Sequence, residues 1–270
     1  DGQVVRSEST TEEKAAERTS DGNGVASVAA NIPPGAPSDT AGNSSNNDRT
    51  ESTTNYEISK TTRTEIQEPG EVKKLAVAVA VDVSDEASVA AGVEAAATEL
   101  GTATILANVA GVLRFAITHE ASVPDFDLMI AVNLKGPFLM SRAVIPGMLA
   151  AGGGAIVNVA SSAGMFGQAY NAGYGASKGG VAIMTRAIAW EYVKQNIRVN
   201  AISPGQVDTP MVNTIDFPEA MDWKLMRKAM TVNGKSLTPD EPAGLIAFLA
   251  SDEAAAITGA VIPIDHGLTC

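Results

Sequence analysis

The feature that most constrains the fold of this chain is a regular alternation of short, Val-rich apolar runs with longer helical segments, which begins near residue 75. Short continuous apolar runs are typical of strands that are buried on both faces of a sheet. Strands that alternate with helices form parallel sheets with helices on both faces. The sequence therefore predicts an α/β fold with a doubly wound parallel β-sheet. The expected strands are 75–82, 104–111, 154–162, 197–205 and 259–265, and the expected helices are 84–101, 124–151, 174–195 and 239–251.

Individual residues mark where these elements begin and end. Ser84 is expected to cap the first helix, and the second helix is either continuous or divided into two near Gly136–Pro137. Asn196 stands where a residue in the left-handed region would end the third helix, a conformation that Asn tolerates. Pro263 cannot donate to a neighbouring strand, so we expect the last strand at a sheet edge or a bulge.

Residues 1–70 differ sharply in composition from the rest of the chain. They contain no Leu, Phe, Met or Trp, only seven Val or Ile, and 25 Ser, Thr or Asn. A segment this polar has few apolar side chains with which to form a core. The boundary near Leu75 therefore separates an atypical segment, 1–74, from a globular core, 75–270, within one expected domain over 1–270.

Charge and cysteine content limit the partners and the compartment. The net charge of −12 disfavours nucleic acid and anionic membrane surfaces as partners. No uninterrupted apolar run approaches the ~18 residues of a membrane span, and the N-terminus lacks the apolar core of a secretion signal. Cys270 is the only cysteine, so no disulfide forms within the chain. We expect a soluble, cytoplasmic protein without a metal site, since His119 and His266 match no metal-ligand spacing.

Tyr174 and Lys178 lie four residues apart at the start of an expected helix, which places them on one helix face. A free phenol has a pKa of about 10 and exchanges protons poorly near neutral pH. A neighbouring ammonium favours the phenolate and lowers that pKa. The pair is therefore able to exchange a proton with an alcohol or a ketone, although this spacing also arises by chance in helices without a catalytic role.

Further polar and small residues follow the expected strands at one edge of the sheet, outside the carboxyl ends where ligands of parallel α/β sheets bind. Ser161 ends one strand there, either to bind a substrate oxygen or to cap the next turn. Asn133 lies within an apolar helical stretch, where its amide must find hydrogen-bond partners. The small residues of 108–111 and 203–205 would let a flat ligand approach the backbone.

In order and spacing, these features resemble the short-chain dehydrogenase/reductase family, whose members are single-domain, nicotinamide-dependent enzymes with a Rossmann-like fold. The resemblance extends from about residue 75 to the C-terminus and includes the thirteen-residue step from Ser161 to Tyr174. The matching segments are DVSD (82–85), NVAG (108–111), VNLKGPF (132–138), GAIVNVASSAG (154–164), YGASK (174–178), IRVNAISPGQVDTPM (197–211) and FLASDEAAAITGAVIPIDHG (248–267).

The resemblance implies an enzyme that interconverts a secondary alcohol and a ketone by hydride transfer. It implies that Tyr174 is the general acid/base, that Lys178 lowers its pKa and binds the nicotinamide ribose, and that Ser161 holds the substrate oxygen. It also implies that Asn133 positions a water in a proton relay. The implied cofactor is NAD or NADP, with NAD favoured, and its implied contacts are Asp82, Val83, Asn108, Ala110, Gly111, Tyr174, Lys178, Pro204, Gly205, Val207 and Thr209.

The substrate is less sharply defined by the sequence. Segment 207–230 mixes Met, Phe and Trp and is expected to form a lid over a small to medium, partly apolar alcohol or ketone. A polyol or sugar, a cyclic alcohol and a 3-oxoacyl thioester remain open. Helices 124–151 and 174–195 resemble those that join subunits in the family, which implies a homotetramer or a homodimer. The residues expected at the substrate pocket are Ser161, Met165, Phe166, Gln168 and Met211.

The chain departs from the family pattern before the first expected strand. The family's Thr-Gly-x-x-x-Gly-x-Gly turn, which lets the backbone approach the cofactor pyrophosphate, has no counterpart in 1–74. Three explanations are open: the polar segment is disordered, its written sequence is foreign to the protein, or a real divergence abolishes cofactor binding. We favour the second, because a strand as apolar as 75–82 needs neighbours on its flank. The third would make the chain a non-catalytic binding or assembly protein with the same fold.

Overall fold

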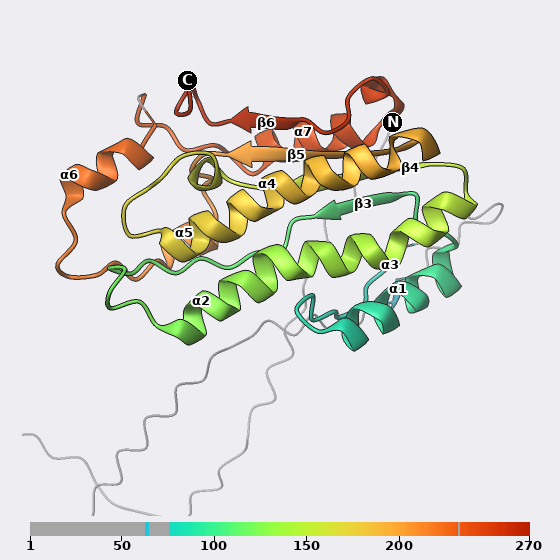
Figure 1. The fold of residues 1–270 in the computed structure, drawn as a ribbon, viewed down its shortest axis with the longest axis horizontal. Coiled ribbons are helices and arrows are strands. Elements are labelled where there is room, and N and C mark those ends of the chain that lie inside the picture. Colours follow the sequence, from blue (N-terminus) through green and yellow to red (C-terminus); the bar gives the residue numbers. More distant parts are fainter. Residues whose placement is uncertain (1–62, 65–75, 232) are drawn as a thin grey trace, which may run out of the picture. The chain divides into compact units, whose positions relative to one another are not determined.

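The computed structural model describes residues 63–64, 76–231 and 233–270 (Figure 1). The chain divides into two units, Asp1–Thr54 and Asn55–Cys270, and every described residue belongs to the second. The prediction of one domain over 1–270 therefore stays a prediction. The explanations for the atypical segment 1–74 concern residues that lie almost entirely outside the described ones.

A parallel sheet of four strands forms the centre of the fold, in the order β3-β4-β5-β6. Each strand pairs in parallel with its neighbour, with Ile156 of β4 opposite Val199 of β5, for example. This arrangement confirms the predicted parallel α/β sheet. The strands are β3 (Ile105–Asn108), β4 (Gly154–Val159), β5 (Ile197–Pro204) and β6 (Val261–Ile264), and a separate antiparallel pair joins β1 (Arg63–Thr64) to β2 (Ala76–Val77).

Helices cover both faces of this sheet. Along β4, Ile156 faces α3 and α4, where it meets Met148, and the next residue, Val157, faces α7, where it meets Leu249. The two faces thus carry separate apolar clusters, as the predicted doubly wound fold requires. The helices are α1 (Glu86–Leu100), α2 (Val123–Ile130), α3 (Gly136–Ala150), α4 (Ala172–Tyr192), α5 (Pro210–Asn213), α6 (Trp223–Met226) and α7 (Asp240–Ala250), with short 3₁₀ turns at Ser162–Gly164, Val193–Gln195, Arg227–Ala229 and Asp252–Ala254.

The helical region over Val123–Ala150 is continuous, so of the two alternatives the one without a break at Gly136–Pro137 holds (Figure 1). A π-helical turn, Ala131–Lys135, instead joins α2 to α3, and Pro137 sits within the first residues of α3, where its missing N–H is tolerated. This rod is the one described helix long and apolar enough to cross a membrane by length and composition. Its residues Val144 and Met148 pack in the core beside the sheet, as in a core helix.

Most boundary residues behave as the sequence predicts. Asn196 ends the helical region in the left-handed conformation, with φ 59°, and Pro263 lies on the edge strand β6. Ser84, however, is not the helix cap. Asp85 occupies that position, and its carboxylate accepts a hydrogen bond of 2.7 Å from the backbone N–H of Ser88.

The prediction of a buried strand over 75–82 is wrong for the part that the structure describes. Ala76 and Val77 pair only with β1, and the chain from residue 78 to 82 has no regular structure. The strand β3 is likewise buried on one face only, since Ile105 is 55% exposed while Leu106 is buried. An apolar run predicts burial only where neighbouring elements cover it, and no described element pairs with the outer side of β3.

Candidate active site

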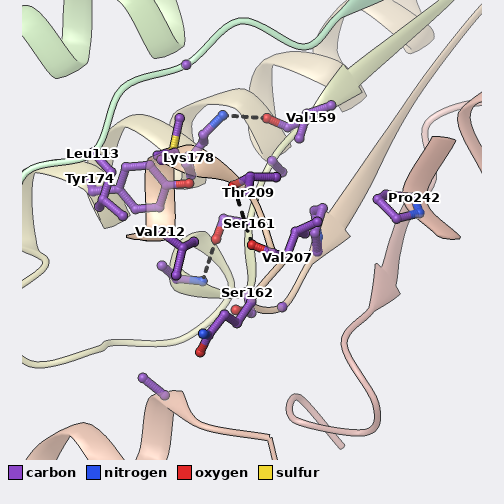
Figure 2. Close-up of a pocket in the computed structure, with 18 of the residues that line it drawn as sticks. Leu113, Val159, Ser161, Ser162, Tyr174, Lys178, Val207, Thr209, Val212 and Pro242 are labelled. Carbon is purple, nitrogen blue, oxygen red and sulfur yellow. Dashed lines mark hydrogen bonds between the residues drawn. The ribbon is translucent and has the colours of Figure 1, made fainter. Parts of the chain in front are cut away.

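A cavity of ≈ 830 Å³ lies at the carboxyl ends of β3, β4 and β5. Its walls come from residues that follow these strands, from the start of α4, and from residues 207–230, which are called the lid segment below. In Figure 1 the lid helices α5 and α6 lie at the end of the sheet toward which the strand arrows point. The side chains expected at this edge therefore surround one cavity (Figure 2).

Lys178 and Tyr174 lie one turn apart near the start of α4, and both line the cavity. Lys178 is only 4% exposed, and its ammonium donates a hydrogen bond of 2.7 Å to the carbonyl of Val159 at the end of β4 (Figure 2). The same nitrogen lies 5.9 Å from the centre of the Tyr174 ring. Because burial disfavours its charged form, the pKa of Lys178 falls from 10.5 to about 8.

The pKa of Tyr174 is shifted in the direction opposite to the predicted one. Burial raises the pKa of the phenol above 10.0, and the hydrogen bond with Ser161 only partly opposes this rise. The sequence predicted that Lys178 would lower this pKa. Because the ammonium is held by the Val159 carbonyl and its own charge is disfavoured by burial, the desolvation of the phenolate prevails. At neutral pH the phenol is therefore protonated and able to donate a proton.

Ser161 follows β4 and combines the two roles that the sequence left open. Its side-chain oxygen accepts a hydrogen bond of 3.2 Å from the backbone N–H of Ala163 and so caps the short turn Ser162–Gly164. The same hydroxyl is hydrogen-bonded to the phenol of Tyr174. A carbonyl oxygen that reaches this phenol would therefore also meet the Ser161 hydroxyl.

Asn133 lies in the π-helical turn and is fully buried. Its side-chain oxygen accepts from the N–H of Val112 at 2.8 Å, and its nitrogen donates to the carbonyl of Val112 at 2.9 Å and to the hydroxyl of Ser177 at 3.0 Å. The Ser177 hydroxyl in turn donates to the carbonyl of Tyr174 at 2.8 Å. Asn133 therefore fixes the chain after β3 against the first turn of α4, and its predicted role in a water relay stays a prediction.

Most of the predicted cofactor contacts lie where a flat ligand could reach them. At Gly111, a Cβ atom would lie 3.2 Å from the side-chain oxygen of Asn133 and 3.5 Å from the nitrogen of Lys178. Only glycine therefore leaves the space beside the ammonium open, which fits a cofactor at this position. The predicted contacts that line the cavity are Gly111, Tyr174, Lys178, Pro204, Gly205, Val207 and Thr209.

Four predicted cofactor contacts do not line the cavity: Asp82, Val83, Asn108 and Ala110. The carboxylate of Asp82 instead accepts hydrogen bonds from the hydroxyl and N–H of Ser84, which lower its pKa. Asn108 is buried and donates to the side chain of Asn158 at 2.8 Å, so it ties β3 to β4. The end of a strand shows correctly at which edge of the sheet a ligand binds. Because side chains point alternately to the two faces of a strand, only some residues at that edge face the ligand.

The residues predicted for the substrate pocket stay a prediction, and the structure brings only some of them to the cavity. Ser161, Gln168 and Met211 line the cavity, whereas Met165 and Phe166 do not. The reason is the 3₁₀ turn after Ser161, which reverses the chain and leaves Met165 39% exposed. Sequence reasoning missed Leu113 and Phe115, which line the cavity directly after the glycine that follows β3. The sequence could have pointed to them, because two large apolar residues follow immediately after a turn that was predicted to bind a ligand.

Two histidines stay outside this site. His119 is exposed beside Glu120, and His266 adopts the left-handed conformation, with φ 52°, where the family pattern has a glycine. Among the residues that the structure describes, no group of His, Cys, Asp or Glu is arranged to hold a metal ion.

Comparison with known proteins shows which family has this fold and site. A family model described as enoyl-(acyl carrier protein) reductase matches residues 53–269. The cis-4-hydroxycyclohexanecarboxylate dehydrogenase of Sinomonas cyclohexanicum is 41% identical over 192 residues, 71% of this chain and 76% of that protein. The D-threitol dehydrogenase of Mycolicibacterium smegmatis is 44% identical over 191 residues, 70% of this chain and 72% of that protein.

A solved structure agrees with these sequence relatives. The crystal structure of 3-ketoacyl-(acyl-carrier-protein) reductase from Brucella melitensis complexed with NADH has a TM-score of 0.65 and 34% identity, and the match covers 71% of this chain and 78% of that chain. The protein is thus an oxidoreductase with a Rossmann-like α/β fold. It belongs to the short-chain dehydrogenase/reductase family. These dehydrogenase and reductase relatives give no support to a non-catalytic binding role.

Proposed function

We propose that the protein interconverts a secondary alcohol and a ketone with a nicotinamide cofactor, with Tyr174 as the general acid/base. The observation that carries this proposal is the convergence of three groups on one cavity: the Tyr174 phenol, the Ser161 hydroxyl bonded to it, and the buried Lys178 ammonium (Figure 2). Packing alone does not require a buried ammonium beside a buried phenol, since each loses hydration there. The relatives named as dehydrogenases support the same reaction class.

In ketone reduction, this chain supplies the proton. The Tyr174 phenol, which is protonated at neutral pH, donates its proton to the ketone oxygen as negative charge develops there. The Ser161 hydroxyl holds the same oxygen. The phenolate that forms is stabilised by the positive charge of Lys178, 5.9 Å from the ring centre. In alcohol oxidation, the same groups act in the reverse order.

The residues around Lys178 fit the nicotinamide end of a dinucleotide. An ammonium has three N–H donors, and the Val159 carbonyl takes one of them, which leaves donors for ribose hydroxyls. Gly111 keeps this space open, and Pro204 to Thr209 line its far side. When bound, the cofactor supplies or accepts the hydride. We propose NAD rather than NADP, a preference that the sequence favours and that the NADH complex of the Brucella reductase agrees with.

We further propose a cytoplasmic homotetramer or homodimer joined through α3 and α4. In support of this assembly, the outward side of these helices carries large exposed apolar residues: Phe138 is 48% exposed, Ile183 62% and Trp190 84%. Side chains of this size are typical of surfaces that a partner covers. The net charge of −12 agrees with the expected absence of nucleic-acid and membrane partners.

Cofactor binding tests the proposed function directly. NADH and NADPH are titrated into the protein, and the fluorescence of the reduced nicotinamide is recorded. We expect saturable binding of NADH that is at least about tenfold tighter than that of NADPH. A Lys178→Met variant should bind NADH more weakly, because it lacks the ammonium that faces the ribose. If neither cofactor binds, the non-catalytic alternative replaces the enzyme.

The rate of ketone reduction is expected to fall as the pH rises through about 8. Below this pH, Lys178 is charged and stabilises the phenolate; above it, the ammonium loses its proton. Tyr174 is still protonated at that point, because its pKa is raised above 10.0. The measurement is kcat/KM for ketone reduction at pH values below and above 8. The Lys178→Met variant should be slow throughout and show no fall in rate near pH 8. A wild-type rate that rises through pH 8 would contradict the assignment.

A further inference from the structure

We infer that the substrate carries a bulky apolar group, a ring or an aliphatic chain, next to its reacting carbon, and that Phe115, Phe217 and Trp223 select this group. This inference deepens the proposed function and rests on it for the reaction. It names the part of the cavity that holds the rest of the substrate. It also disfavours polyols, which the sequence left open.

The three aromatic residues form a continuous wall of the cavity. The ring centres of Phe115 and Phe217 lie 5.1 Å apart at 49°, and those of Phe217 and Trp223 lie 5.3 Å apart at 59°. Tilted contacts at these distances are favourable for aromatic rings. Because Phe115 follows β3 and the other two belong to the lid segment, the wall joins the core of the fold to its lid.

A backbone hydrogen bond holds the lid end of this wall in place. The N–H of Asp222, directly before Trp223, donates to the hydroxyl of Tyr170 at 2.8 Å. Tyr170 itself adopts the left-handed conformation, with φ 63°, which is uncommon for a residue with a side chain. Its carbonyl also accepts from the N–H of Ala116, next to Phe115. Tyr170 thus links both ends of the wall, so the wall is ordered without a substrate.

The surfaces around the wall are apolar as well. Leu113 continues it on the core side, and the lid segment adds Met211, Ile215, Met226 and Met230. Unbranched Met side chains adapt to apolar groups of different shapes. This part of the cavity can therefore enclose a ring or a chain.

The part of the cavity beside the aromatic wall offers few hydrogen-bonding groups to further hydroxyls of a substrate. Tyr174 and Ser161 serve the reacting oxygen, and the hydroxyl of Thr209 donates to the carbonyl of Val207. Gln168 accepts from Asn171, whose own side-chain oxygen has no hydrogen-bond partner among the atoms described. Ser162, Gln168 and Gln206 also bring polar side chains to the cavity, but the aromatic wall and the apolar residues beside it offer only the indole N–H of Trp223. Hydroxyls that a polyol places against this wall therefore stay mostly unpaired, and each unpaired hydroxyl weakens binding roughly tenfold. The cavity therefore disfavours a substrate like the threitol of one relative's name.

A ketone series tests the inference through turnover. The probes are cyclohexanone, 2-heptanone, acetone and erythrulose, each reduced with NADH and followed by nicotinamide absorbance. Each buried methylene is worth about fourfold, so we expect cyclohexanone and 2-heptanone to exceed acetone and erythrulose at least about tenfold in kcat/KM. Phe217→Ala and Trp223→Ala should lower kcat/KM for cyclohexanone about tenfold and leave acetone within about twofold. Phe248→Ala, on α7 outside the cavity, is the matched control.

A binding measurement separates this inference from the proposed function. The chain has two Trp residues, so Trp190→Phe leaves Trp223 as the sole indole reporter. Combined with Tyr174→Phe, this variant is titrated with cyclohexanol and with erythritol, and we expect only cyclohexanol to quench the fluorescence. A quench without turnover of any ketone by the wild type would support the apolar site and refute the proposed reaction. Erythrulose or acetone reduced as fast as cyclohexanone would overturn the inference and leave the reaction standing.

Discussion

Replacement of Tyr174 by Phe is expected to lower kcat for ketone reduction by a factor of about 10²–10⁴, the usual contribution of a positioned proton donor. The substitution removes one hydroxyl and keeps the ring that packs at the cavity wall beside Lys178. Ser161 keeps its hydrogen bond from the N–H of Ala163. We therefore expect the melting temperature to change by no more than a few degrees. Steady-state kinetics and thermal unfolding check the two halves of this expectation.

A second tyrosine on the same helix provides the control for this substitution. Tyr192 ends α4, far along the helix from the cavity, and does not line it. Tyr192→Phe should therefore leave kcat unchanged. Retention of most of the activity by Tyr174→Phe would refute its assignment as the proton donor.

Replacement of Asn133 by Ala is expected to lower the free energy of unfolding by about 2–4 kcal/mol and to reduce kcat at least about tenfold. The buried amide makes three hydrogen bonds, and its loss leaves the N–H and carbonyl of Val112 without these partners. It also frees Ser177, whose hydroxyl supports the carbonyl of Tyr174. Denaturant unfolding measures the first effect, and steady-state kinetics measures the second.

A matched asparagine separates stability from positioning. Asn200 is also fully buried, and its amide likewise bridges backbone groups: it donates to the carbonyl of Ile257 and accepts from the N–H of Ala260. Asn200→Ala should therefore destabilise the fold to a similar degree. Its residual folded protein should keep the wild-type kcat, because Asn200 binds the backbone of Ile257 and Ala260 and not the segments that hold Tyr174. If both variants lose kcat equally, Asn133 has no positioning role of its own.

The sequence predicted the elements that contribute whole faces to the core. The strand over 197–205 and the helix over 174–195 appear as β5 and α4 within a few residues, because strong apolar patterns and an end signal at Asn196 agree there. The placement of β6 at the edge also followed from one residue, Pro263, which cannot donate to a ladder.

The errors share a physical cause: each depends on neighbours that lie far away in sequence. The run 75–82 is apolar enough for a buried strand, but the described part of the chain gives it only the short pairing with β1. The phenol of Tyr174 was expected to be acidified by Lys178, yet burial depends on everything that covers it, and here burial dominates. The cofactor contact that the resemblance assigns to Asn108 stays a prediction, and its amide nitrogen is already hydrogen-bonded to Asn158 on the next strand.

The aromatic wall was predicted only in part. The expected lid over 207–230 contains Phe217 and Trp223, but Phe115 lies about a hundred residues earlier and belongs to no motif that points to chemistry. The resemblance assigned catalytic roles to Asn133, Ser161, Tyr174 and Lys178, and these roles stay predictions, although the last three residues line one cavity. Which residues of the lid segment meet Phe115 depends on how two distant loops fold together, and no local pattern predicts that.

The π-helical turn at Ala131–Lys135 changes the directions in which α2 and α3 point their side chains around the shared helix axis. Each residue of an α-helix rotates the chain by about 100° around the axis. Because the π-helical turn holds one residue more than an α-helical turn, it rotates the side chains of α2 relative to those of α3. Met129 thus packs against Gly173 of α4, while Met148, beyond the turn, packs against Gly154 of the sheet. In a uniform α-helix, the 19 steps from Met129 to Met148 would place these side chains about 100° apart around the axis, and the extra residue of the π-helical turn largely removes this offset. The irregular turn therefore lets one continuous rod contact both α4 and the sheet, while its buried Asn133 binds Val112 and Ser177.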